Sequence, residues 1–279
     1  MYRTKLCLNA TPLFGISIEE QLRLIAEIGF DGFFTVWDEH VADYRRLADA
    51  LDLQFQSIHA PVNHIAGMWD GGDDADAGVR QLTACLDDCA ANGVPIMVSH
   101  VWLGYDTKSG PTDAGLCAFE KVITAAETRG VTVALENTEG EDYLAALMEA
   151  FGDRKNVGFC WDSGHEACYA KNIDFLACHG EQLVATHIND NLGIGAYDGT
   201  LSGGDDLHLM PFDGIIDWQD AASRLARTRF NGPLTFELKR KNDRRPYIGD
   251  KYAKMSPMEF VTEAYIRACR FAAMRDRLL

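Results

Sequence analysis

The stretch GFCWDSGHEAC, residues 158–168, runs a short apolar segment into Asp162 and reaches His165 three residues later. The segment before Asp162 has the length and aromatic content of a buried strand, and a helical pattern begins directly after it. A carboxylate is seldom buried without a partner, because removing its charge from water is unfavourable. The stretch therefore predicts a buried strand that carries a polar site at its end and is followed at once by a helix.

The same alternation of strand and helix recurs along the chain. Short runs rich in β-branched and aromatic residues are followed by longer amphipathic segments with helix start signals, in eight pairs. Two predicted helices begin with the spacing of a capping box, at Ser17 and Ser256, and Gly29, Gly93 and Gly130 have the placement of left-handed helix caps. The predicted strands cover residues 4–9, 31–36, 54–59, 95–100, 131–136, 157–162, 183–188 and 233–238.

Eightfold alternation in a chain of 279 residues predicts parallel strands closed into a (β/α)8 TIM barrel, with residues 1–279 as a single domain. A doubly wound open sheet is the alternative fold. It would ordinarily carry a glycine-rich phosphate turn after the first strand, and NATPLFG, residues 9–15, contains neither GxGxxG nor a P-loop. The longest irregular segment, residues 189–213, is expected to be functional, as loops of that length usually are.

Composition and charge narrow the class of partner. Hydrophobic residues make up 47% and charged residues 24% of the chain, which is typical of a globular protein, and the formal net charge is −16. A field of this sign repels phosphate backbones and anionic membranes, so we expect neither nucleic acid nor a membrane as partner. The sequence has no signal-peptide pattern and no window of transmembrane length, and we therefore expect a cytoplasmic protein.

Eight cysteines are scattered through apolar or helical contexts without a CxxC pair. In a long chain this pattern predicts reduced cysteines that are buried as packing residues. Cys85 and Cys89 are spaced by one helical turn, so we expect them to be neighbours on one helix face.

Residues with metal-ligand chemistry stand at or next to the ends of six consecutive predicted strands. In a parallel barrel all strands open their carboxyl ends on one face, so these side chains converge although they are far apart in sequence. Several carboxylates buried together are strongly unfavourable without a cation. The six residues are His59, His100, Glu136, Asp162, His187 and Glu237.

Four of the six, Glu136, Asp162, His187 and Glu237, offer three carboxylates and one imidazole. Such a set predicts one divalent metal ion, and its excess of oxygen suits manganese, magnesium or cobalt, with zinc less diagnostic. Asp162 also has the position of the N-cap of the helix that follows, and the two roles are compatible. Either His59 or His100 alone could be a core histidine, but the other ligand-type residues at neighbouring strand ends favour a role in a metal or substrate site.

Six segments carry a resemblance to a known family: SIHAP (57–61), ALENT (134–138), WDSGH (161–165), THINDN (186–191), DLHLMPFDGIIDW (206–218) and FELK (236–239). With them the chain resembles the xylose isomerase-like barrels, which include sugar-phosphate isomerases, ketose 3-epimerases, inosose and dehydroshikimate dehydratases, and endonuclease IV. In the epimerase branch, the resemblance implies that Glu136, Asp162, His187 and Glu237 hold the metal. It further implies substrate-binding roles for His59, His100, His165 and His208.

The function we expect is that of a metal-dependent sugar or sugar-phosphate isomerase or epimerase. Glu136 and Glu237 would be the acid/base pair that removes and returns a proton through an enediolate stabilised by the metal. The expected partner is a small-molecule sugar or polyol, and the resemblance is compatible with a homo-oligomer.

Three other functions remain open. A dehydratase of the inosose or dehydroshikimate type would share the first proton abstraction and then expel a hydroxyl group. A barrel that only binds a sugar would be expected to lack a ligand, whereas the set of four is complete. An abasic-site nuclease like endonuclease IV would hold three zinc ions, and the acidic charge weighs against it. Its nine ligands would be His59, His100, Glu136, Asp162, His165, His187, Asp206, His208 and Glu237.

Some residues depart from the epimerase pattern. His208 stands in place of the arginine usual after the seventh strand, and Asp142 has the spacing of a second glutamate. Trp37 and Trp102, near the ends of the second and fourth strands, could line a substrate pocket. The basic run KRKNDRR, residues 239–245, would lie on the catalytic face. A phosphate or carboxylate could bind there to Lys239, Arg240 or Arg244, and a solvated loop is the alternative.

Overall fold

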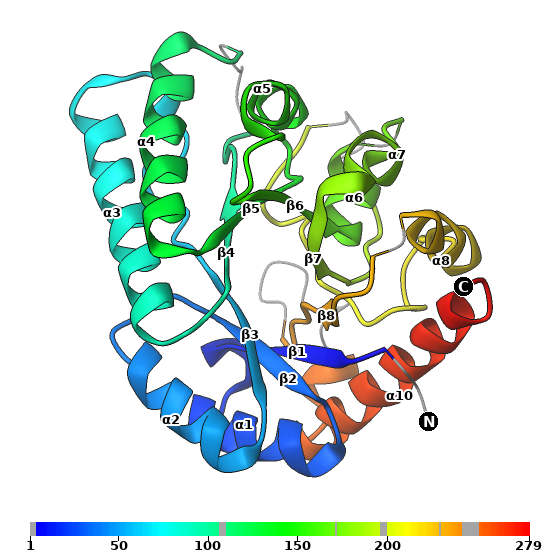
Figure 1. Cartoon of the computed structure of the whole chain (residues 1–279). Helices are drawn as coiled ribbons and strands as arrows, with labels where there is room; N and C mark the ends of the chain where they lie inside the picture. The colour runs from blue at the N-terminus through cyan, green and yellow to red at the C-terminus, as the bar shows by residue number, and fades with distance from the viewer. Residues whose placement is uncertain (1–3, 106–109, 171, 196–199, 229, 242–250) are drawn as a thin grey trace.

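Eight parallel strands form a nearly closed barrel that is surrounded by helices (Figure 1). The computed structural model describes residues 4–105, 110–170, 172–195, 200–228, 230–241 and 251–279. The predicted (β/α)8 TIM barrel is therefore confirmed. The strands are β1 Leu6–Ala10, β2 Gly32–Val36, β3 Gln54–His59, β4 Ile96–His100, β5 Thr132–Glu136, β6 Val157–Asp162, β7 Leu183–His187 and β8 Leu234–Phe236.

The barrel closes between β7 and β8. The strand order is β7-β6-β5-β4-β3-β2-β1-β8, and the two outer strands meet through a parallel bridge between Ile188 and Phe236. The N–H of Ile188 donates to the carbonyl of Thr235 at 2.8 Å, and the N–H of Glu237 donates to the carbonyl of Ile188 at 3.2 Å. These bonds lie just past the ends of both strands, so the closure directly supports the polar end of the barrel.

The predicted strands 54–59 and 157–162 match β3 and β6 in full, and the others differ by one or two residues at either end. The prediction was wrong in placing Glu237 within the eighth strand, because β8 ends at Phe236. Beyond that point the backbone pairing with β1 gives way to a side chain of β1: that of Asn9 donates to the carbonyl of Leu238 at 3.0 Å and accepts from its N–H at 2.9 Å.

The helix start and stop signals predicted from the sequence are present in the structure. Both capping boxes are present, at Ser17 and Ser256, and each is completed by the glutamate three residues later. Gly29, Gly93 and Gly130 adopt positive φ angles of 111°, 63° and 66°. The α-helices are α1 Ile18–Ile28, α2 Val41–Leu51, α3 Gly72–Ala91, α4 Asp113–Arg129, α5 Glu141–Phe151, α6 Ser163–Tyr169, α7 Phe175–His179, α8 Trp218–Arg227 and α10 Pro257–Asp276, and the 3-10 helices are η1 Pro12–Phe14, η2 Gly67–Trp69 and η3 Gly180–Gln182.

Two groups of buried side chains lie on the two sides of the barrel wall. The larger packs the strands against the helices, and a small one fills the barrel interior. Each interior residue stands two positions before a polar strand end, and residues two apart in a strand share a face. This alternation aims the polar side chains into the mouth of the barrel. The interior residues Val98, Ala134, Cys160 and Ala185 thus precede His100, Glu136, Asp162 and His187.

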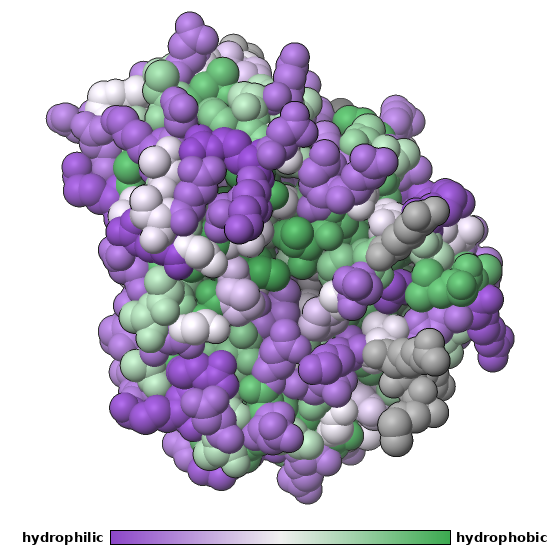
Figure 2. Space-filling model, in the orientation of Figure 1, coloured by the Kyte–Doolittle hydropathy of each residue, from purple (hydrophilic) through white to green (hydrophobic). Residues whose placement is uncertain are grey.

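The surface of the molecule is largely hydrophilic on the face seen in Figure 2. In Figure 2 hydrophilic residues form most of the outline of the visible face, and hydrophobic residues show toward its middle, over the end of the barrel. Among the described helices, none combines the length and the apolar composition that crossing a membrane requires.

All eight cysteines are free, as predicted, but the predicted burial is confirmed for five of them only: two are exposed, and Cys269 is half-buried. Cys117 on α4 and Cys178 on α7 are exposed, because each lies on the outward face of its helix. Cys85 and Cys89 are neighbours on the buried face of α3, as their spacing predicts.

A thiol reagent is expected to modify Cys117 and Cys178 rapidly in the folded protein and to reach the five buried cysteines only after unfolding. The measurement is the number of thiols labelled against time, with and without denaturant. A variant in which both exposed cysteines are serine should lose the fast phase. Fast labelling of a buried cysteine such as Cys160 would contradict the barrel packing.

Candidate metal and substrate site

Glu136 lies at the centre of the candidate site. Its side chain is fully buried, and its Oε1 lies 2.8 Å from Nδ1 of His187. Its Oε2 lies 3.3 Å from Nε2 of His59 and 3.4 Å from Nε2 of His100, and accepts no aligned hydrogen bond from a described residue. Three imidazoles from β3, β4 and β7 therefore surround one carboxylate from β5.

His187 joins Glu136 to Glu237. Its Nδ1 lies 3.1 Å from Oε2 of Glu237, and its ring stacks on Phe34 with the centroids 4.5 Å apart. Burial lowers the pKa of His187, but the two facing carboxylates outweigh it and raise the pKa well above its usual range. Stacking and charge together fix Nδ1 as the atom that faces the centre of the site.

Asp162 is held from both of its carboxylate oxygens. Oδ1 accepts the backbone N–H of His165 at 2.7 Å, so Asp162 is the N-cap of α6, as predicted. Oδ2 accepts from Nδ2 of Asn189 at 2.9 Å. Burial raises the pKa of this carboxyl group to about 6. A carboxylate kept in such a place is stabilised when a cation binds beside it.

One potential ligand atom from each of Glu136, Asp162, His187 and Glu237 lies within 4.8 Å of the others. We call these four residues the first ligand group. Three carboxylates face one imidazole, and Oε2 of Glu136 is left without a hydrogen bond from the described residues. Oxygen and nitrogen ligands bind divalent ions at about 2.0–2.2 Å, so the four residues fit such an ion in number, chemistry and spacing.

A second set of residues lies beside the first. One ligand atom from each of His165, Asp206 and His208 lies within 4.8 Å of the others, and we call them the second ligand group. Oδ2 of Asp206 lies 2.6 Å from Nε2 of His208 and 3.0 Å from Nζ of Lys239. His208 has a positive φ of 45°, which is uncommon for a residue with a Cβ. Strain of this kind is frequent at functional sites.

A cleft of about 390 Å³ opens over both groups. Its volume suits a small-molecule ligand. Trp37 lines one wall, and its indole N–H donates to Asp88 at 2.7 Å, which fixes the ring. Trp102 does not belong to this lining, because it stacks on Tyr143 with the centroids 4.4 Å apart. The cleft is lined by Val36, Trp37, His59, Ala60, Pro61, Val62, Asn63, His100, His165, Asp206, His208, Glu237 and Lys239.

The four predicted substrate-binding histidines all line this cleft. Burial lowers the pKa of His100 to about 3, so its imidazole is neutral and can donate at one nitrogen and accept at the other. Glu237 lines the cleft as well, with its side chain 17% exposed, whereas Glu136 is fully buried beneath it. The two predicted acid/base residues are therefore brought together but differ in their access to a ligand.

Comparison with known proteins shows the family to which this fold belongs. The sequence model of the xylose isomerase-like TIM barrel family matches residues 22–257. The chain belongs to this family. The uncharacterized protein y4fM of Sinorhizobium fredii is 29% identical, over 79% of this chain and 80% of its own length.

Two solved structures illustrate the fold of the family. The IolI protein with a bound zinc atom has a TM-score of 0.74 at 18% identity, with 99% of both chains covered. An L-ribulose 3-epimerase has a TM-score of 0.71 at 17% identity, with 98% of this chain and 96% of its own covered. At this level of identity, the likeness establishes the fold of these proteins in this chain.

In this member of the xylose isomerase-like family, asparagines that sequence reasoning overlooked position the first ligand group. Nδ2 of Asn137 donates to the carbonyl of Asp162, and its Oδ1 accepts the N–H of Asp162, both at 2.8 Å. Asn9 holds Leu238, next to Glu237, in the same two-bonded way. An asparagine at or directly after the end of a barrel strand is the signal that could have revealed this function.

Replacing Asn137 with alanine is expected to raise the metal dissociation constant by about 10–100-fold, because the main chain of Asp162 loses both of its side-chain restraints. Calorimetric titration with Mn²⁺ measures the change. The matched control is Asn156→Ala, which removes a hydrogen bond to the carbonyl of Val131 at the opposite end of the barrel. Equal losses of affinity in the two variants would contradict a positioning role.

Two further residues that the sequence analysis singled out, Asp142 and Arg240, do not line the cleft. Asp142 is exposed in the first turn of α5. In the basic run, the guanidinium of Arg240 donates to the backbone carbonyls of Phe14 and Met255, both at 2.8 Å, so it supports the loops around the barrel. Arg244 and the rest of residues 242–245 lie outside the described residues. Of the described residues of the basic run, 239–241, Lys239 lines the cleft.

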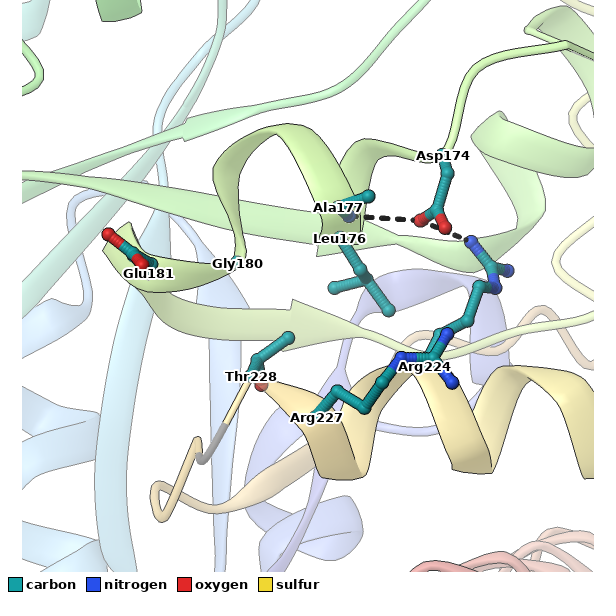
Figure 3. A pocket seen from close by; sticks show the side chains of 8 residues that line it. All are labelled: Asp174, Leu176, Ala177, Gly180, Glu181, Arg224, Arg227 and Thr228. Carbon is teal, nitrogen blue, oxygen red and sulfur yellow. Dashed lines mark hydrogen bonds and ion pairs between the residues drawn. The ribbon is translucent and has the colours of Figure 1, made fainter.

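A larger pocket of about 490 Å³ lies away from the cleft, between α7, η3 and α8 (Figure 3). Asp174 caps α7 through the N–H of Ala177 and accepts from Arg224 at 3.0 Å. Arg224 also pairs with Glu166 at 2.7 Å and Asp220 at 2.9 Å. Because its guanidinium is surrounded by carboxylates, this pocket offers structural ion pairs rather than a reactive group.

Proposed function

We propose that the chain is a metal-dependent isomerase or epimerase of a sugar, sugar phosphate or related polyol. The observation that carries the proposal is the position of Glu237, whose carboxylate belongs to the first ligand group and also lines the cleft. A proton acceptor in that place can reach a carbon atom next to a carbonyl group bound over the ligand group. The presence of an L-ribulose 3-epimerase among the similar structures supports a reaction of this class.

The first ligand group would hold one divalent ion of manganese, zinc, magnesium or cobalt. When bound there, such an ion would polarise a substrate carbonyl and offset the negative charge that develops when the neighbouring carbon loses its proton. Glu237 removes that proton, because its carboxylate is open to the cleft. His59 and His100 bind substrate hydroxyl groups on one side of the cleft, and His165 and His208 bind them on the other.

The route of the returning proton decides the product. If Glu136 returns a proton to the opposite face of the same carbon, the product is an epimer. If Glu237 returns the proton to the neighbouring carbon, the product is an aldose–ketose isomer. Because Glu136 is fully buried, we expect Glu237 to act first.

Proton exchange with solvent tests this proposal before the natural substrate is known. The Mn²⁺-loaded protein is incubated in D₂O with a panel of ketoses, their phosphates and inosose, and ¹H NMR follows the signals of the protons next to the carbonyl. Loss of such a signal together with a new sugar product supports the proposal. A product that has lost water would instead assign a dehydratase. Absence of exchange across the panel in fully loaded protein would count against the proposed chemistry.

A further inference from the structure

Lys239 occupies an unusual place beside the second ligand group. Its Nζ lies 3.0 Å from Oδ2 of Asp206 and 3.1 Å from the backbone carbonyl oxygen of the same residue. Its backbone N–H donates to the carbonyl of His208 at 3.1 Å, so the whole residue is tied to the segment that carries the second ligand group. The ammonium group is therefore held from two sides against the carboxylate of that group.

We propose that the ammonium of Lys239 takes the place of a metal ion in the second ligand group, so that His165, Asp206 and His208 do not bind a metal. The group has the composition of a metal site, with two imidazoles and one carboxylate whose ligand atoms lie within 4.8 Å of one another. It is also nearly buried, because the side chains of His165 and His208 are 5% exposed and that of Asp206 is 18% exposed. Without Lys239 it would be a competent site for zinc.

Charge repulsion is the reason that both cations cannot be present. A zinc ion binds a carboxylate oxygen at about 2.0–2.2 Å, and Nζ of Lys239 lies 3.0 Å from Oδ2 of Asp206. An ion bound to that oxygen would therefore lie within about 5 Å of the ammonium group. Repulsion between a dication and a monocation at that separation weakens binding by about 10-fold in a water-like medium and about 10⁵-fold at an effective dielectric of 20.

Two further contacts agree with this assignment. Oδ2 of Asp206 already accepts from both Nζ of Lys239 and Nε2 of His208, which leaves this oxygen little capacity for another partner. Its other oxygen, Oδ1, accepts no hydrogen bond from a described residue and lies 3.5 Å from Nε2 of His165, so the exclusion of an ion there depends on the charge of the ammonium group. The ammonium of Lys239 also lines the cleft and is 26% exposed at its side chain. Two of its three N–H groups are taken by Asp206, so the third can donate to an oxygen atom of a bound substrate. Lys239 thus prevents metal binding at the second ligand group and supplies one hydrogen-bond donor to the cleft.

The inference rests on the proposed function only in assuming that the first ligand group is the metal site, and its test reads metal binding without an activity assay. Zinc chloride is titrated into the metal-free protein by calorimetry, and bound zinc is counted by elemental analysis after dialysis. We expect Lys239→Met to bind one more zinc equivalent than the wild-type protein, at least about 10-fold more tightly than any second-group binding in the wild type. Lys239→Arg keeps the positive charge and should bind the wild-type number.

Two comparisons assign the additional ion. Adding His208→Ala to Lys239→Met should remove the extra equivalent, whereas His208→Ala alone should leave the wild-type count unchanged. Lys121→Met, which removes an exposed lysine on α4, controls for the loss of a surface charge. An unchanged count in Lys239→Met would overturn the proposal. So would a lost equivalent in His208→Ala alone, which needs no Lys239 variant to fold. Neither result would affect the proton-exchange test of the proposed function.

Discussion

Replacement of Glu237 with glutamine is expected to lower the turnover number by about 10³-fold, within the range that a positioned proton acceptor contributes. Glutamine keeps the shape of the side chain and an oxygen atom that can bind a cation, but it cannot accept a proton at neutral pH. The loss should fall mainly on the turnover number, because the carboxylate acts on the reacting carbon in the transition state. The measurements are steady-state kinetics on a substrate found by proton exchange, and deuterium incorporation from D₂O.

The effect must be separated from a loss of metal, because Glu237 belongs to the first ligand group. Both proteins are therefore assayed at saturating Mn²⁺, with the bound metal counted. Glu39→Gln is the matched control: it makes the same chemical change at the same end of the barrel, on a side chain that is 83% exposed. If Glu237→Gln with full metal occupancy retained turnover within tenfold of the wild type, another residue would have to be the first base.

The residues of the first ligand group could be predicted because barrel strands alternate strictly between their two faces. In β5 the small interior residue Ala134 precedes Glu136 by two positions, and in β6 Cys160 precedes Asp162 in the same way. The local sequence pattern therefore predicts that both carboxylates point into the barrel. Convergence then follows from the shared direction of all strands. The inward direction of the side chains can be predicted from the local sequence, and their convergence follows from the barrel fold, which the length and periodicity of the chain indicate.

Glu237 shows where this reasoning loses accuracy. A strand pattern continues through Leu238, but its backbone groups are paired with the side chain of Asn9, more than two hundred residues earlier in the chain. A side-chain amide that replaces the backbone hydrogen bonds of a neighbouring strand leaves no periodic signal in the sequence. The sequence therefore identified Glu237 as a candidate ligand but did not identify Asn9 as the residue that holds the segment around it.

The second ligand group depends on a loop whose path the sequence does not specify. Asp190, which is fully buried, exchanges two backbone hydrogen bonds with Leu209, and its carboxylate accepts the indole N–H of Trp218 at 2.9 Å. These contacts set where Asp206 and Lys239 meet, 33 residues apart in sequence. The pairing of Asp206 with Lys239 arises from tertiary contacts that leave no local pattern. From the sequence, Lys239 could therefore be interpreted only as part of a basic run that is a candidate anion site.

Replacement of Asp162 with asparagine is expected to raise the metal dissociation constant by at least about 100-fold, more than the loss of an indirect contact produces. The substitution removes a negative charge from the first ligand group. It also sets a second amide against Nδ2 of Asn189, which now donates to Oδ2 of Asp162 at 2.9 Å. One of the two amides must then give up its hydrogen bond or turn its oxygen away from the metal site. Calorimetric titration with Mn²⁺ and with Zn²⁺ measures the change.

Thermal unfolding gives a second reading of the same change. A ligand at a thousand times its dissociation constant stabilises the native state by about 4 kcal/mol, which corresponds to about 10 °C in Tm for a chain of this size. We expect a shift of that order when metal is added to the chelated wild-type protein, and less than about 4 °C in Asp162→Asn, because a site at least 100-fold weaker is filled to no more than about ten times its dissociation constant. The control is Asp217→Asn, which alters another N-cap aspartate, that of α8, on an exposed residue that does not belong to the first ligand group. Since Asp162 both caps α6 and belongs to the ligand group, only the comparison of the two N-cap variants separates these roles. Equal metal-dependent shifts in both would mean that Asp162 serves its helix alone.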